Sequence, residues 1–343
     1  MNIAYLIDSG RWDPATLYTH DIACAMKRLG HDVTVCIPKN DALEQFFNSA
    51  ELNTRRTIHT NLPFFNPYIL SGMIKKEGIS IVHANSIRTA SIAARAVELS
   101  GKNDVKTILT PHCHENDSQI ARNIITSLDA LATHTIEAPH YLKEIPIRVF
   151  ALRYSIPDTG QPAQEPSSSN TITVNGAITQ EKHIDKLFEA VSNLDAIDYR
   201  IRIIGEGKAA HVMPLKQAAQ RFDIADRIEW LGNRPDALDL IKDSAVGVEL
   251  SGESGLYRVA EFQSAGVPVI ASGSFGADRY INDGENGFIV PSDDLAEKLT
   301  EALHTALSDR TFLNRFKAYR ENNPIEPYDN YAMRLASIYS SLL

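Results

Sequence analysis

VELSGESGLYRVAEFQSAGVPVIA, residues 248–271, contains a strand, a loop, a helix and a second strand in succession. The apolar run that ends at Leu250 predicts a buried strand, a helix is expected over 256–265, and 267–271 is again continuously apolar. Two successive strands joined through a helix are parallel, because a parallel pair needs a long crossover connection. The stretch therefore predicts an α/β fold built on a parallel sheet.

The same alternation of strand and helix extends over both halves of the chain, which favours doubly wound sheets. Asp13 is the expected N-cap of the first helix, with Pro14 at its first position. Residues 272–288 are rich in turn formers. The strands expected from apolar runs are 3–7, 32–38, 79–84, 105–112 and 130–136 in the first half, and 171–177, 200–205, 227–231, 245–250 and 267–271 in the second.

Residues 157–170, PDTGQPAQEPSSSN, interrupt this pattern. Three prolines and three consecutive serines without apolar periodicity are typical of a solvated linker. Each half is then a complete α/β unit. We expect two Rossmann-like domains that face each other across a cleft, because ligands of this fold class bind at the carboxyl ends of parallel strands.

Composition narrows the class of protein. The chain has 343 residues, 43% of them hydrophobic, and a net charge of −9, which excludes a disordered chain. No apolar run approaches the roughly 18 residues of a membrane span, and residues 1–8 do not resemble an export signal. An acidic chain without a Lys/Arg run is not expected to bind nucleic acid. Three cysteines fit a reducing compartment, so a cytoplasmic location is expected.

Two acids flank the predicted start of the helix near Leu256. Glu253 lies on the loop and Glu261 about two turns into the helix. Free N–H groups at a helix start can bind an anion, and carboxylates can accept hydrogen bonds from sugar or ribose hydroxyls. On spacing alone, the more common arrangement is that Glu253 caps the helix and Glu261 faces solvent. Both interpretations stay open on the residues alone.

This stretch resembles the Glu-x7-Glu signature of family-4 retaining glycosyltransferases with GT-B architecture (glycosyl transferases group 1). Glu253 and Glu261 stand at its two acids, and AGVPVIA at 265–271 and NGFIV at 286–290 resemble the segments that follow. GAITQEKHIDKLFEA at 176–190 and LGHDVTV at 29–35 resemble two further family motifs. The similarity extends over nearly the whole chain.

The resemblance implies transfer of a hexose or N-acetylhexosamine from a nucleotide diphosphate sugar, with UDP as the first expectation. The acceptor would be a glycan, a glycolipid or a small molecule, and the setting cell-envelope polysaccharide biosynthesis. It also implies at most peripheral contact with the inner face of the membrane. The expected domains are an acceptor-side domain 1–156, a linker 157–170, a nucleotide-sugar domain 171–326, and a helix 327–343 that returns to the first domain.

The resemblance also implies roles for individual residues. Glu253 would contact the donor sugar, Glu261 the ribose, and His112 the sugar near the reacting centre. Lys182 would neutralise the departing diphosphate, together with backbone N–H groups at the helix start. The expected catalytic residues are Glu253, His112 and Lys182, and the expected donor-binding residues are Glu261, Leu256, Tyr257, Arg258, Gly255, Gly10 and Gly176.

Several positions depart from the family pattern. Ala177 replaces the family's phosphate-binding arginine, and His183 replaces the glycine after Lys182. Arg258 is a candidate to restore the missing positive charge. The alternative is a catalytically weakened sugar-nucleotide-binding protein, or an epimerase or hydrolase on the same fold.

No cofactor and no metal are expected, because the sequence contains no Asp-x-Asp that could hold a metal on the diphosphate. His112 and His114 could share one face of a strand end and bind zinc. However, the sequence supplies no second cluster to complete a tetrahedral set, so a hydrogen-bonding role of His112 is preferred. His83 ends a buried strand and is expected to be a core histidine.

Overall fold

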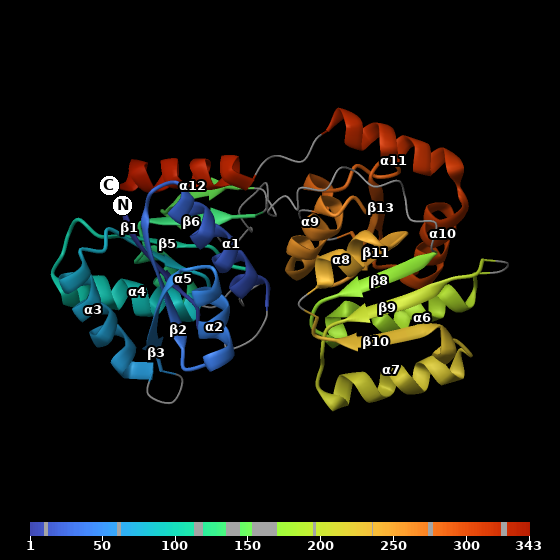
Figure 1. Cartoon of the computed structure of the whole chain (residues 1–343), viewed down its shortest axis with the longest axis horizontal. Helices are drawn as coiled ribbons and strands as arrows, with labels where there is room; N and C mark the ends of the chain where they lie inside the picture. Colours follow the sequence, from blue (N-terminus) through green and yellow to red (C-terminus); the bar gives the residue numbers. More distant parts are fainter. Residues whose placement is uncertain are drawn as a thin grey trace. The chain divides into compact units, whose positions relative to one another are not determined.

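The computed structural model describes residues 1–9, 13–59, 63–112, 119–134, 145–152, 170–194, 197–234, 236–273, 277–323 and 328–343. The chain forms two compact units. Unit 1 comprises Met1–Ser155 and Glu326–Leu343, and unit 2 comprises Ile156–Ile325 (Figure 1). The expected linker lies almost wholly outside the described residues.

Unit 1 contains a seven-stranded parallel sheet in the described part of the chain, with the order β3-β2-β1-β4-β5-β6-β7. The order reverses between β1 and β4, and such a switch point opens a crevice at the carboxyl ends of the strands. The strands are β1 (Asn2–Leu6), β2 (Asp32–Pro38), β3 (Asn53–Ile58), β4 (Ile81–Ala84), β5 (Lys106–Leu109), β6 (Ala130–Thr133) and β7 (Arg148–Ala151).

The first helix of unit 1 begins as the sequence predicts. The Asp13 side chain accepts a hydrogen bond from the Thr16 N–H at 2.9 Å, and Pro14 occupies the first turn. The last helix of the chain also belongs to unit 1 and is drawn in red in Figure 1. The helices are α1 (Pro14–Arg28), α2 (Asp41–Ser49), η1 (Pro63–Phe65), α3 (Asn66–Glu77), α4 (Ile87–Ser100), α5 (Gln119–Thr126) and α12 (Tyr328–Leu342).

Unit 2 contains a second parallel sheet, with six strands among the described residues in the order β10-β9-β8-β11-β12-β13. Its strand order reverses between β8 and β11. The strands are β8 (Thr171–Asn175), β9 (Arg200–Ile204), β10 (Ile228–Gly232), β11 (Val246–Glu249), β12 (Val269–Ser272) and β13 (Gly287–Val290). The α-helices are α6 (Ile184–Ser192), α7 (Ala209–Arg221), α8 (Ala237–Lys242), α9 (Leu256–Ser264), α10 (Leu295–Ser308) and α11 (Arg310–Asn322), and the 3-10 helices are η3 (Gln180–Lys182), η4 (Ala225–Arg227), η5 (Gly252–Gly255) and η6 (Ala277–Arg279).

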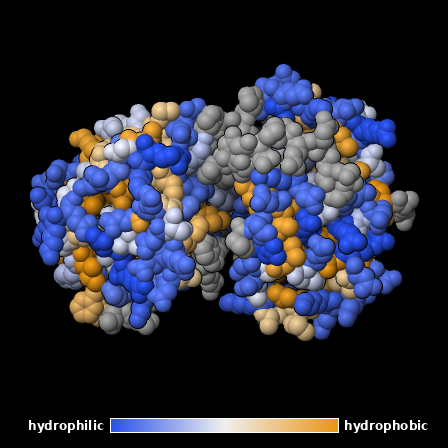
Figure 2. Space-filling view, viewed as in Figure 1, coloured by the Kyte–Doolittle hydropathy of each residue, from blue (hydrophilic) through white to orange (hydrophobic). Residues whose placement is uncertain are grey.

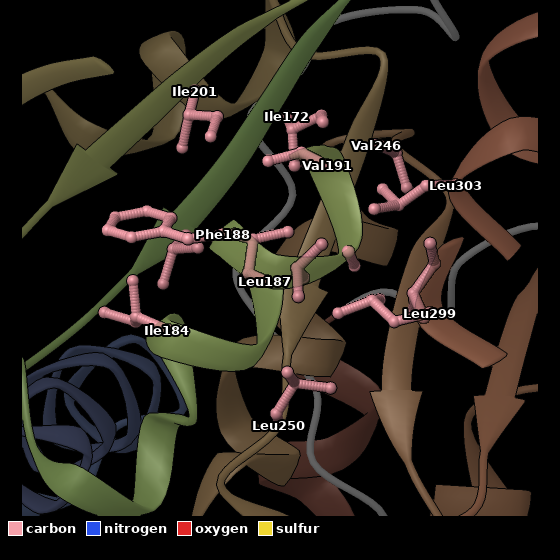
Figure 3. Packing of buried hydrophobic residues seen from close by; sticks show 14 of the residues in the cluster. Ile172, Ile184, Leu187, Phe188, Val191, Ile201, Val246, Leu250, Leu299 and Leu303 are labelled. Carbon is pink, nitrogen blue, oxygen red and sulfur yellow. The ribbon is translucent and has the colours of Figure 1, made fainter. Parts of the chain in front are cut away.

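The core of unit 2 explains how β11 is placed. Figure 3 shows Leu187 and Val191 of α6 beside Leu299 and Leu303 of α10, and all four belong to one buried cluster with strand residues such as Val246. The next residue, Gly247, faces the opposite side, since side chains alternate along a strand. A Cβ at Gly247 would lie 2.4 Å from the Phe262 ring of α9. Helices therefore cover both faces of β11.

The structure contains three strands that apolar runs did not predict, β3, β7 and β13. Each lies at an edge of its sheet. In β3 (NTRRTI) the apolar signal is weak, because an edge strand buries fewer side chains and this one carries two arginines, whereas β13 (GFIV) is apolar but follows a segment rich in turn formers. Helices α2, α3 and α11 were likewise not predicted. The parallel α/β fold class is confirmed.

No helix in the described part of the chain is long and apolar enough to cross a membrane. The face of each unit seen in Figure 2 is mostly hydrophilic, with small separate hydrophobic areas.

Candidate functional site

The candidate site of unit 2 lies where its strand order reverses. Val246 pairs with Ile172 and Gly247 with Thr173, and this register brings the strand ends Asn175 and Glu249 side by side. The first residue after β8 is Gly176, with φ of +112°. Two polar side chains and a glycine thus meet at the carboxyl edge of the sheet, where ligands of α/β proteins bind.

Lys182 reaches this edge from η3. Its ammonium group donates a hydrogen bond to the Asn175 carbonyl oxygen at 2.8 Å and an ion-paired hydrogen bond to Oε2 of Glu249. Glu249 is 1% exposed and Lys182 7%. Buried charges of this kind persist only when they are paired. Lys182 is therefore held in one place by two partners from different strands.

A second buried ion pair lies on the first two turns of α9. Arg258 donates from Nη1 to Oε2 of Glu261 at 2.8 Å, and the same oxygen accepts from Nδ2 of Asn175 at 2.7 Å. Burial lowers the pKa of Arg258, but the carboxylate of Glu261 outweighs it and the pKa is raised overall. Among the described residues, none hydrogen-bonds the other oxygen of Glu261. That oxygen can accept a hydrogen bond from a ligand hydroxyl.

The two cations meet at Gly176. A Cβ at this position would lie 3.2 Å from Nε of Arg258 and 3.4 Å from Nζ of Lys182. Only glycine leaves that space open, and its left-handed backbone also disfavours any side chain. Ala177, which follows, is exposed. Arg258 thus places a positive charge beside Gly176, next to the position of Ala177.

The start of α9 adds backbone donors to this region. Gly255 is its N-cap, and Leu256, Tyr257 and Arg258 are its first three residues, all buried. No side chain caps the helix, and the positive end of its dipole lies at these three residues. A Cβ at Gly255 would lie 2.5 Å from the carboxyl carbon of Glu249. The helix start therefore lies directly against the Glu249 carboxylate.

Three residues that the sequence singles out are not placed by the described part of the structure. Gly10 and His114 lie outside the described residues, and so does the side chain of Glu253 within η5. Conversely, sequence reasoning missed Glu249 and Asn175. Each is the last residue of its strand, and a polar residue at the carboxyl end of a buried parallel strand was the signal that could have found them.

The predicted residue His112 belongs to unit 1, just beyond β5. Its Nε2 donates to Oδ1 of Asn85 at 3.3 Å, and Nδ2 of Asn85 donates to the Thr19 hydroxyl at 2.6 Å. The ring also lies 4.6 Å from that of Tyr18. Burial lowers the pKa of His112 to about 3. The side chain is therefore neutral at ordinary pH and acts as a hydrogen-bonding group.

His83 is a core histidine, as predicted. Its Nε2 contacts the Thr110 hydroxyl at 2.8 Å, and its Nδ1 contacts the Tyr339 hydroxyl. Both ring nitrogens are thus used within the buried interior of unit 1.

Comparison with known families matches both halves of the chain. Residues 156–323 match the model described as Glycosyl transferases group 1, and residues 15–143 match Glycosyltransferase Family 4. A curated relative is the lipopolysaccharide core biosynthesis glycosyltransferase LpsE of Rhizobium meliloti (strain 1021), 25% identical over 151 residues. That alignment covers 44% of this chain and 43% of the relative, so it spans less than half of either protein.

Solved structures show the same fold. Anabaena Alr3699/HepE in complex with UDP-glucose superimposes with a TM-score of 0.84 at 16% identity, over 99% of this chain and 100% of that one. The apo form of the lipopolysaccharide outer core galactosyltransferase WaaB has a TM-score of 0.73 at 16% identity, over 100% of both chains. The expected GT-B fold is thereby confirmed.

Proposed function

Because the chain belongs to the glycosyl transferases group 1, with a first half of the Family 4 type, we propose that it transfers a hexose or N-acetylhexosamine from a UDP-sugar. Anabaena HepE is named as a complex with UDP-glucose, and the relatives LpsE and WaaB are named for lipopolysaccharide core synthesis. These names favour UDP as the nucleotide and a glycan or glycolipid of the cell envelope as acceptor.

One observation carries the proposal, the meeting of Lys182 and Arg258 at Gly176. When the bond between the sugar and the diphosphate breaks, negative charge develops on the leaving phosphate. Cations and N–H groups that are already in place stabilise that charge most effectively. Lys182, Arg258 and the first N–H groups of α9 would form this set, without a metal ion.

The remaining roles follow from the family resemblance and the geometry of each residue. Glu261 would accept a hydrogen bond from the ribose, with its second oxygen. His112, neutral and hydrogen-bonded through Nε2, would contact the donor sugar. Glu253 would hold sugar hydroxyls. The acceptor oxygen would attack the anomeric carbon on the face that the diphosphate leaves, and its proton would pass to a leaving phosphate oxygen, so that the configuration is retained.

Thermal stability in the presence of nucleotides tests the donor class. A ligand present at about 100 times its Kd raises the free energy of unfolding by about 2.7 kcal/mol if it binds only the folded protein. UDP and UDP-sugars should raise the Tm, whereas GDP, ADP and CMP should not. If the Tm rises only with a nucleotide that carries another base, that nucleotide and not UDP is the ligand. Absence of any shift would contradict a sugar-nucleotide enzyme.

Product analysis then separates the transferase from the alternatives. The proposal predicts that UDP-sugar is consumed only when an acceptor is present, with the new bond in the α or β configuration of the donor. Consumption without acceptor would instead indicate an epimerase or hydrolase. Nucleotide binding without any turnover would indicate the weakened binding protein that Ala177 suggests. Unchanged activity in excess EDTA would support a metal-independent reaction.

A further inference from the structure

The carboxylate of Glu249 is surrounded by groups that bind anions. Oε2 accepts the ion-paired hydrogen bond of Lys182, and Oε1 accepts the N–H of Ser251 at 2.9 Å. The start of α9 at Gly255 lies against the same carboxylate, on the side where the helix dipole is positive. Glu249 is thus bound in the manner of an anionic ligand, although it belongs to the chain.

Lys182 and the start of α9 contact Glu249, and the proposed function assigns the same two groups to the diphosphate. Among the side chains that the structure describes at this edge, the buried charges balance, since two cations, Lys182 and Arg258, face two carboxylates, Glu249 and Glu261. A diphosphate that enters therefore meets a neutral cluster and shares Lys182 with a carboxylate already bound to it. Like charges near one cation weaken each other's binding.

On the basis of the proposed function, we infer that Glu249 is an internal counter-ion that competes with the nucleoside diphosphate for Lys182. It keeps the ammonium group in position in the empty site and weakens the hold on the diphosphate after transfer. Glu249 thereby sets how tightly the nucleotide product is held and how fast it leaves. It acts through Lys182, as a positioning residue.

A purely structural role of Glu249 predicts the opposite sign. If the carboxylate served only to fix Lys182, its loss would weaken nucleotide binding. If it competes with the diphosphate, neutralising it strengthens binding, and only for ligands that carry phosphates. Uridine, which has the base and ribose of UDP but no phosphate, therefore provides the internal reference.

The test is Glu249→Gln, which keeps the size of the side chain and an acceptor for Lys182. Calorimetric titration should show UDP bound about tenfold more tightly than by the wild type, with unchanged affinity for uridine. Steady-state kinetics should show stronger product inhibition by UDP and a lower kcat. Glu261→Gln, at the other carboxylate of the cluster, is the matched control and should weaken the binding of both ligands.

A second variant removes the Glu249 carboxylate and tests whether a small carboxylate from solution can replace it. In Glu249→Ala, UDP should also bind more tightly, and added formate should restore the weaker affinity of the wild type by occupying the vacated carboxylate position. Unchanged or weaker UDP binding in both variants, or equal gains for UDP and uridine, would overturn the inference. If the wild type itself does not bind UDP, the proposal of a UDP-sugar donor is contradicted, and the inference about Glu249, which rests on it, is contradicted as well.

Discussion

The hydroxyl of Tyr339 lies 2.9 Å from that of Tyr5, so the last helix of the chain is hydrogen-bonded to its first strand. The same Tyr339 hydroxyl contacts Nδ1 of His83 on β4. Nearby, the Tyr331 hydroxyl donates to that of Tyr18 on α1 at 3.0 Å. Buried polar groups such as these must be paired with one another, which fixes the position of α12 on unit 1.

Removal of the Tyr339 hydroxyl should destabilise unit 1. In Tyr339→Phe, two buried partners lose a hydrogen bond, which should lower the free energy of unfolding by about 1–3 kcal/mol. Urea unfolding measures the change. Tyr68→Phe is the control, because Tyr68 is 60% exposed and its loss should have little effect. Equal stability of Tyr339→Phe and the wild type would show that the contact contributes nothing.

Unit 1 should lose stability in mild acid. Burial lowers the pKa of His83, and likewise that of His112, from 6.5 to about 3. The unfolded chain takes up these protons near pH 6.5 and the folded chain only near pH 3. The contribution of each of these two histidines to stability is therefore complete above pH 6.5 and falls as the pH decreases toward 3, by up to about 2 kcal/mol per histidine at pH 5.

Urea unfolding at pH 7 and pH 5 measures this effect, and His83→Gln should reduce the difference between the two values, since one of the two protons is no longer taken up. A wild type equally stable at both pH values would rule out the buried neutral histidines as acid-sensitive groups.

Loss of Lys182 should reduce transfer strongly. Lys182→Ala removes one cation from the leaving diphosphate, which should cost about 2–4 kcal/mol in the transition state. The measurement is kcat/KM with the donor that thermal stability identifies. Lys186→Ala is the control, because the Lys186 side chain is 42% exposed and forms a surface ion pair with Glu189. A loss below about tenfold would reject the role of Lys182.

The same variant leaves Glu249 buried without its cation, so stability has to be separated from catalysis. Lys182→Met combined with Glu249→Leu removes both charges, and replacing a whole buried pair is often neutral for folding. We expect this double variant to be folded and inactive. Activity in a folded double variant would show that neither side chain takes part in the reaction.

Arg258 should be exchangeable in part with an arginine at position 177. Arg258→Ala removes the second cation at Gly176 and should lower kcat/KM by at least about tenfold. Adding Ala177→Arg should recover part of that loss, since position 177 follows Gly176 directly and is exposed. If Ala177→Arg gave no recovery, the two positions would not supply the same charge, and the role of Arg258 would be limited to its pair with Glu261.

Much of this architecture follows from the sequence alone. Alternating apolar runs and helical segments predicted parallel α/β units, and the stretch from Val248 to Ala271 was identified correctly as strand, helix and strand. These features are local, because a strand buried on both faces is rich in apolar residues and a helix repeats them at a period of 3.6. The family motif around Glu261 is also local, because its residues follow one another at fixed spacing along the chain, so the resemblance could be found without the tertiary structure.

The charge arrangement of the site was decided only by the tertiary structure. Lys182 and Glu249 are separated by 67 residues, and no local pattern links them. They meet because β8 and β11, which are not successive strands, become neighbours where the sheet reverses its order. Arg258 is placed beside Gly176 by the same neighbour relation. Long-range pairing of strands depends on the packing of the entire unit. It brings Lys182, which a sequence motif indicated, into a buried ion pair with Glu249, which no motif indicated.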